Sequence, residues 1–414
     1  MRNLFDQYNQ PENRLNHALL ISLDEDRALL SRFIKWATGK PAPASASRLQ
    51  VLEQTLPGEE ELQEQDESER RGLPDGCIHD ENGWALLIES KVASSLDQRQ
   101  LRSHRRSAGN HGISSVNLLA LVVEGKPIDD VVVKRWTDLY KWLKGQHRDS
   151  YWAKQLISYM EVLEAKLPNE GYLKKGALTV FTGIPFGRET PYSYREAKRL
   201  IRLAMDGLRV HEALRKDLGA DLKRKGRTAI KGKDAAGVWD IFWLENAKAF
   251  TEVPHLNFSI LNDRIEAMVI VPDKIGPRFR RRLLEGGWDA FQAVFAEVLE
   301  CFDARFKNVD GAVPWVTVLQ RHSLHRGAEP IVDAQLKFDL HTAFAGAKSV
   351  KPQHEWLRVA YDALSEKKSN IEFDVGVIFR YEQCPNLNSP EILNLISSAW
   401  LSCKPFVRKM IPED

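Results

Sequence analysis

Apolar residues recur at helical spacing near the start of the chain and gather into short runs farther on. The positions between residues 11 and 36 predict a helix, with Asn9 as its N-cap and Pro11 in its first turn. Strands are predicted at residues 48–56, 77–79, 84–88 and 116–123. The last run is almost entirely apolar, which is typical of a strand covered on both faces. Helices are predicted at residues 97–108, 131–143 and 151–167, the second of these entered from a short strand.

The second half of the chain also mixes predicted strands and helices, and it follows a helix stop at Leu167-Pro168-Asn169-Glu170-Gly171. Strands are predicted at residues 177–182, 238–244, 256–261, 265–271, 313–319, 335–340 and 373–379. Helices are predicted at residues 278–306, 355–364 and 390–403, and residues 193 to about 225 are expected to be helical with interruptions at Gly207 and Gly219. We therefore expect two domains, residues 1–170 and 171–414, the second with an α+β fold.

A turn signal separates two of the predicted strands in the first half. Asn82-Gly83 tolerates the positive φ angles that tight hairpins require, so the runs on either side are expected to pair. This pairing brings Asp75 alongside Glu89. Because side chains alternate along a strand, Glu89 and Lys91 share a face. Two carboxylates and one ammonium are thus predicted at the end of a mostly apolar strand pair.

These three side chains suggest a metal site. Two carboxylates held close together repel each other, and a divalent cation relieves that repulsion; hard oxygen ligands of this kind suit Mg²⁺ or Mn²⁺. Lys91 can hold a phosphate or orient an attacking water. The alternative is a solvated ion pair, which is common near hairpins of charged chains. Glu89 directly follows five mostly apolar strand positions, which favours the site, since packing alone does not require a charge there.

Composition changes this picture at a few points. The chain has 414 residues and a formal net charge of +2, so any nucleic-acid site must come from local clustering of charge. The four cysteines are far apart and fit reduced, isolated thiols. We expect a cytoplasmic protein, because the first residues lack the apolar core of a signal peptide and no apolar run is long enough to span a membrane. The ATP-binding motif GxxxxGK[ST] is absent.

The order Pro74-Asp75, hairpin, Glu89-Ser90-Lys91 resembles the PD-(D/E)XK pattern of the restriction-endonuclease-like nuclease superfamily. The predicted element order also resembles the α-β-β-β-α-β core of that superfamily, over roughly residues 1–170. The resemblance implies an α/β fold, in which a restriction-endonuclease-like core precedes a C-terminal α+β domain for nucleic-acid recognition or assembly.

The same resemblance implies roles for the residues of the motif. Asp75 and Glu89 would hold Mg²⁺ or Mn²⁺ together with the Ser90 carbonyl. Lys91 would orient the attacking water or neutralise charge on the phosphate. In the superfamily a glutamate on the first helix often completes the acidic site, and Glu12 is the corresponding position here. The alternative for Glu12 is a simple interaction with the helix dipole.

A second feature of some members of the superfamily is a glutamine followed four positions later by tyrosine or histidine. Gln100-Leu101-Arg102-Ser103-His104 looks like that pattern. Gln100 and His104 would lie one helical turn apart on one face, where Gln100 would position the lysine or a phosphate. The alternative is an exposed polar face of the helix.

Basic residues cluster in the second half of the chain, on the helix predicted from residue 193 and the segment after it. The candidate phosphate contacts are Arg195, Lys198, Arg199, Arg202, Lys223, Arg224, Lys225 and Arg227. A nucleic-acid backbone binds such a stripe through counterion release, without reading sequence. The alternative is a solvated helix face followed by a loop.

These observations favour a Mg²⁺-dependent phosphodiesterase that acts on DNA, as an endonuclease rather than an exonuclease. By resemblance, a nuclease of this build suggests a homodimer and a role in bacterial restriction or anti-phage defence. The alternative is a non-catalytic nucleic-acid-binding or sensor protein, whose nuclease-like half only binds while its second half docks a partner protein encoded nearby. The two hypotheses differ in whether metal-dependent cleavage occurs.

Overall fold

The computed structural model describes residues 8, 10–43, 46–57, 73–173, 176–226, 236–273, 277–325, 328, 330–344, 351–366 and 371–412. The chain divides into two compact units, Met1–Val180 and Phe181–Asp414, so the boundary follows residue 180 rather than residue 170. Both units combine helices with a β-sheet. None of the helices in the described segments has both the length and the apolar character that crossing a bilayer requires.

The first unit contains a five-stranded sheet whose spatial order is the chain order. Its strands are β1 (Gln50–Glu53), β2 (Gly76–His79), β3 (Trp84–Lys91), β4 (Ser115–Val122) and β5 (Val132–Arg135). β1, β2 and β3 pair antiparallel, whereas β3, β4 and β5 pair parallel. A parallel pair needs a crossover connection, and α3 (Gln98–Asn110) supplies it between β3 and β4. The expected order of helix, strands, helix and strand is present.

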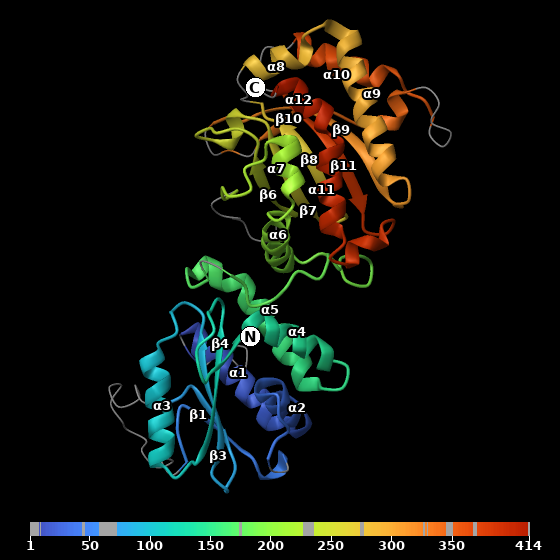
Figure 1. Ribbon diagram of the computed structural model, residues 1–414. Coiled ribbons are helices and arrows are strands. Elements are labelled where there is room, and N and C mark those ends of the chain that lie inside the picture. The colour runs from blue at the N-terminus through green and yellow to red at the C-terminus, as the bar shows by residue number, and fades with distance from the viewer. Residues whose placement is uncertain are drawn as a thin grey trace. The chain divides into compact units, whose positions relative to one another are not determined.

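Helices cover both faces of this sheet (Figure 1). α1 (Pro11–Glu25), α2 (Arg27–Thr38), α4 (Trp136–Gln146) and α5 (Tyr151–Glu170) share one apolar core with the sheet, and α3 packs into a smaller core on the other face. Strand β3 serves both cores, because Leu86 and Ile88 point into the larger one and Leu87 into the smaller one. This explains why residues 84–88 are apolar without alternation.

The helix expected over residues 11–36 is two helices. The chain breaks at Asp26, whose side chain accepts hydrogen bonds from the Leu29 amide and from the Ser150 hydroxyl. Asp26 is therefore the N-cap of α2 and ties it to the start of α5. Gln10 is the N-cap of α1, and Asn9, which we expected there, lies outside the described residues.

The second unit is built on a six-stranded antiparallel sheet with the order β10-β9-β11-β8-β7-β6. Its strands are β6 (Gly237–Trp243), β7 (His255–Leu261), β8 (Arg264–Val271), β9 (Ala312–His322), β10 (Ile331–Asp339) and β11 (Ile371–Arg380). Its helices are α6 (Tyr194–Leu208), α7 (Glu212–Leu218), α8 (Pro277–Leu284), α9 (Gly287–Phe306), α10 (Glu355–Glu366), α11 (Ile392–Ser402) and α12 (Lys404–Met410). One aromatic-rich core joins helices and sheet.

Three expectations for the second half were wrong. Residues 177–182 form no strand, because the backbone amides of Leu178 and Thr179 donate to the buried Glu164 carboxylate instead of to a neighbouring strand. The helix expected over 278–306 breaks at Gly286 and Gly287, which have φ angles of 87° and 75°. The helix expected over 390–403 also divides in two, giving α11 and α12.

Candidate active site

The β2–β3 hairpin sets the position of the predicted acidic residues. Asp80 closes its turn by accepting hydrogen bonds from the amides of Asn82 and Trp84 at 3.0 and 2.8 Å. The strand register then pairs Gly76 with Ile88. Asp75 and Glu89 each lie one residue beyond that pair, so the hairpin brings them to the same end of the sheet.

Asp75, Glu89 and Lys91 converge at this end. The Ser90 amide donates to Asp75 Oδ2 at 2.7 Å, and Lys91 Nζ lies 2.5 Å from Glu89 Oε1. The Glu89 side chain is almost fully buried, with 1% of its surface exposed, and that of Lys91 is 16% exposed. The Glu89 carboxylate therefore lies inside the protein, whereas Asp75 and Lys91 are partly exposed.

The charges in this cluster act strongly on one another. Burial, together with the negative charge of Glu89, raises the pKa of Asp75 to about 7, although the hydrogen bond from the Ser90 amide and the charge of Lys91 oppose the shift. Burial alone would lower the pKa of Lys91. The charges of Glu89, Asp75 and Glu12 outweigh that effect and raise the pKa of Lys91 above its ordinary value. Lys91 therefore keeps its positive charge, and the side chains around it are acidic.

Glu12 reaches the cluster from the first turn of α1. Its Oε1 accepts hydrogen bonds from the amides of Val92 and Ala93, at 3.2 and 2.8 Å. These amides directly follow Lys91, so Glu12 fixes the backbone that carries the lysine. These hydrogen bonds of Glu12 are structural, and its charge also contributes to the raised pKa of Lys91.

Asn16, one helical turn after Glu12, was not singled out from the sequence. Its Nδ2 donates to the backbone carbonyl of Asp75 at 2.5 Å, and its Oδ1 accepts from the Ser90 hydroxyl at 3.3 Å. Asn16 is 1% exposed. The signal available in the sequence was an asparagine next to the apolar positions Leu15 and Leu19 of the predicted helix, because an amide that is buried there needs polar partners.

Replacing Asn16 with alanine should destabilise the protein by about 2 kcal/mol, since it leaves the Asp75 carbonyl and the Ser90 hydroxyl buried without this partner. Urea denaturation measures the free energy of unfolding. The matched control is Asn13→Ala, which removes a partly exposed asparagine from the same helix. Equal stabilities of the two variants would show that Asn16 does not hold the two strands together.

Helix α3 contributes a buried histidine. His104 Nε2 lies 2.9 Å from Glu89 Oε2, so the two oxygens of Glu89 face Lys91 and His104 respectively. Gln100 lies one turn earlier on the same side of α3 and is half-buried. Within the described residues we find no hydrogen bond from the Gln100 side chain. Of the two residues of the sequence pattern, His104 is the one that contacts Glu89, and the role of Gln100 stays a prediction.

A divalent cation fits the chemistry of this donor set. Asp75 and Glu89 are hard oxygen ligands. Burial and the charge of Glu89 together raise the pKa of Asp75, and a cation would relieve the repulsion between the two carboxylates. The Ser90 amide donates to Asp75 and its hydroxyl donates to Asn16, and the role of its carbonyl as a metal ligand stays a prediction. Among the described residues, no group of three or more His, Cys, Asp or Glu side chains is arranged to hold a metal ion. Mg²⁺ suits two carboxylates, because it keeps several waters and also binds substrate phosphate.

The basic residues expected on α6 and after it have different surroundings. Arg199 is buried and bonded to Glu196, so it does not belong to an exposed stripe. Arg224 stacks on the Trp243 ring at 3.5 Å and bonds to the Ala247 carbonyl. Arg202 and Lys198 are partly buried, whereas Arg195, Lys223 and Lys225 are exposed; Arg227 lies outside the described residues. The inward arginines stabilise the fold, which leaves a smaller basic surface than the sequence suggested.

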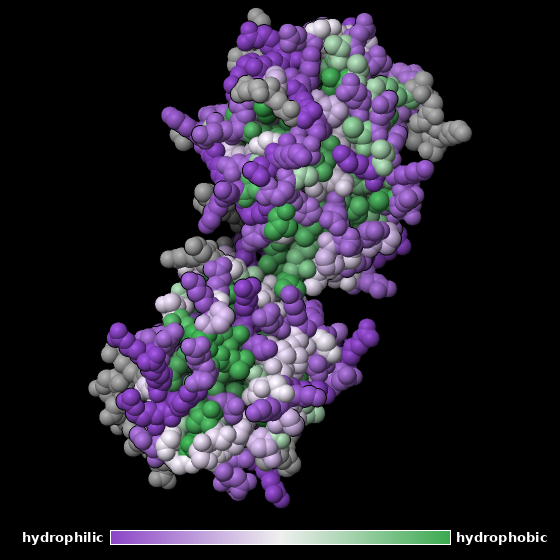
Figure 2. Space-filling model, viewed as in Figure 1, coloured by the Kyte–Doolittle hydropathy of each residue, from purple (hydrophilic) through white to green (hydrophobic). Residues whose placement is uncertain are grey.

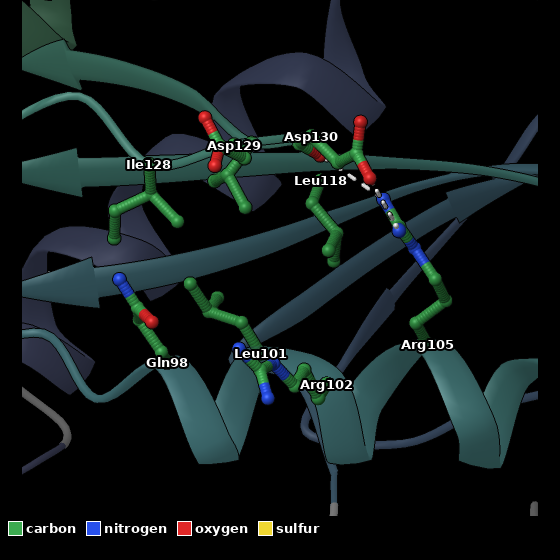
Figure 3. A pocket seen from close by; sticks show the side chains of 9 residues that line it. Gln98, Leu101, Arg102, Arg105, Leu118, Ile128, Asp129 and Asp130 are labelled. Carbon is green, nitrogen blue, oxygen red and sulfur yellow. Dashed lines mark hydrogen bonds and ion pairs between the residues drawn. The ribbon is translucent and has the colours of Figure 1, made fainter.

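Another basic surface lies on the exposed face of α3. Arg99, Arg102, Arg105 and Arg106 are exposed on α3, and Figure 2 shows hydrophilic side chains over this region of the first unit. A cavity of about 250 Å³ lies between α3 and the segment 128–131. Figure 3 shows the ion pair of Arg105 with Asp130 at one end of it. This cavity contains none of the predicted catalytic residues.

No protein-family model matches this chain, and a search of curated proteins finds no similar sequence. The interpretation of the site therefore rests on the arrangement of its own residues.

Proposed function

We propose that the protein is a metal-dependent phosphodiesterase that hydrolyses nucleic acid, with DNA as the favoured substrate. The observation that carries the proposal is the convergence of Asp75, Glu89 and Lys91 at one end of the first sheet. A phosphodiester is an anion, and it gains negative charge as water attacks it. A fixed cation beside a site for a divalent ion suits that reaction.

Each residue of the site would have its own role in hydrolysis. Asp75 and Glu89 would hold Mg²⁺ or Mn²⁺, which when bound lowers the pKa of a coordinated water and neutralises phosphate charge. Lys91 would bind a phosphate oxygen, and His104 would orient Glu89 through their 2.9 Å contact. Glu12 and Asn16 would hold the strand ends in place from α1. An arrangement in which every charged group is held by a neighbour needs little reorganisation during the reaction.

A second candidate function is binding without cleavage. Both oxygens of Glu89 already face a cationic or hydrogen-bonding partner, Lys91 and His104. A Glu89 carboxylate that keeps both partners is unavailable to a metal, and the first unit then only binds nucleic acid. Salt-sensitive binding without hydrolysis would then be expected.

Incubation with plasmid, oligonucleotide and RNA substrates distinguishes the two functions. Hydrolysis is expected with Mg²⁺ or Mn²⁺ and not with chelator, and gel electrophoresis measures it. Binding measured with chelator present is the matched comparison. Binding to nucleic acid with no cleavage under either metal would reject the enzymatic proposal and support the second candidate.

A further inference from the structure

A cavity of about 540 Å³ opens beside Lys91. It lies at the carboxyl ends of the parallel strands β3 and β4, where ligands of open α/β sheets usually bind. Lys91, Ser94 and Ser95 contribute to its wall, and so do Glu124 and Tyr172. A volume of this size is within the range of sites that hold a small organic ligand.

Tyr172 gives this cavity an aromatic wall. The residue follows the C-cap of α5, where Gly171 has a φ of 81° and the Tyr172 amide donates to the Leu167 carbonyl at 3.0 Å. The next residue, Leu173, is buried. The backbone is thus held on both sides, while 38% of Tyr172 remains exposed. A ring on a fixed backbone can stack on a flat ligand with little loss of conformational freedom.

The charges of the wall indicate how a ligand would be oriented. Lys91 attracts an anionic group, and the exposed hydroxyls of Ser94 and Ser95 can donate hydrogen bonds to it. Glu124 repels anions but accepts hydrogen bonds from amino groups. A ligand that carries a phosphate at one end and a flat ring with amino groups at the other matches this distribution. A nucleotide unit of a nucleic acid has that chemistry.

We propose that this cavity binds single-stranded nucleic acid, with one phosphate at Lys91 and an unpaired base stacked on Tyr172. The inference rests on the proposed function and assigns its substrate class. Both faces of a base within a duplex are covered by stacked neighbours, so only an unpaired base can meet the ring. Single strands and frayed ends are therefore the preferred substrates, ahead of fully paired duplex.

The test compares Tyr172→Ala and Tyr172→Trp with the wild-type protein. Binding of a labelled single-stranded oligonucleotide, as DNA and as RNA, is measured by fluorescence anisotropy with chelator present. Tyr172→Ala should weaken binding by about 5- to 150-fold, the range expected for one lost base–aromatic stack, and Tyr172→Trp should bind nearly as the wild type does. Binding of a fully paired duplex should be weaker in the wild type and unchanged by either substitution.

The matched control is Tyr151→Ala, which removes an exposed tyrosine at the other end of α5, outside the cavity. Unchanged single-strand binding by Tyr172→Ala, or wild-type preference for duplex, would overturn the inference. Because these measurements need no metal, they separate it from the proposed function. Tyr172-dependent binding without hydrolysis under Mg²⁺ or Mn²⁺ would uphold the inference and reject the catalytic role.

Discussion

Replacing Asp75 with asparagine is expected to reduce metal-dependent hydrolysis by ~10³-fold or more, while the protein becomes more stable at pH 8. The amide keeps the shape of the carboxylate and can still accept the hydrogen bond from the Ser90 amide. It removes the negative charge that burial and Glu89 both disfavour. Loss of activity together with gain of stability is characteristic of a group kept for its function rather than for the fold.

Initial rates of plasmid cleavage and urea denaturation measure the two effects. The matched control is Asp80→Asn, which changes the aspartate at the opposite end of the same hairpin. Asp80→Asn should lose some stability, because Asp80 closes the turn, but should keep its activity. Wild-type cleavage rates in Asp75→Asn would refute the assignment of Asp75.

Metal binding should stabilise the protein more at about pH 8.5 than at about pH 5.5. The pKa of Asp75 is raised to about 7 in the folded protein, so this carboxyl holds a proton at the lower pH. The native state binds this proton more tightly than the unfolded chain does. The contribution of Asp75 to stability therefore falls as the pH rises from its ordinary pKa through about 7. A cation bound to the deprotonated carboxylate restores this stability. Because the cation and the proton compete for Asp75, the affinity of the protein for the metal should fall about tenfold for each pH unit below 7.

Thermal unfolding measures this effect without any substrate. The midpoint temperature is compared with Mg²⁺ or Mn²⁺ and with chelator, at both pH values, for the wild type and for Asp75→Asn. The wild type should show a metal-dependent rise that is larger at the higher pH, and Asp75→Asn should show little rise at either pH. An equal rise in the two proteins would mean that the metal binds elsewhere.

The hairpin was predictable because the signals that specify it are local. Asn82-Gly83 marks the turn, and the period of a strand then fixes which side chains share a face. Asp75, Glu89 and Lys91 could be placed together on these grounds alone. The helix breaks were harder to predict. Asp26 ends one helix and caps the next by accepting from the Leu29 amide, and it also accepts from the hydroxyl of Ser150, which lies 124 residues away.

The parts of the site that the sequence did not reveal come from packing between distant segments. Asn16 meets Asp75 across 59 positions of the chain, and no local pattern encodes that contact. The apolar run at 177–182 looked like a strand, but the carboxylate of Glu164 takes its amides. Arg199 looked like an exposed base on its helix, yet its pairing with Glu196 allows it to be buried. In the first two cases a contact with another segment outweighed the local preference, whereas Arg199 is paired with a residue of its own helix.

The contacts from α1 also bear on when the site is assembled during synthesis. Glu12 and Asn16 leave the ribosome long before the strands that they hold, from which 59 to 81 residues separate them. The strand ends gain these contacts only when the completed hairpin folds back onto α1. Under the proposed function, detachment of α1 would therefore disturb the site without unfolding the sheet. Heating should then stop hydrolysis below the temperature at which the whole domain melts.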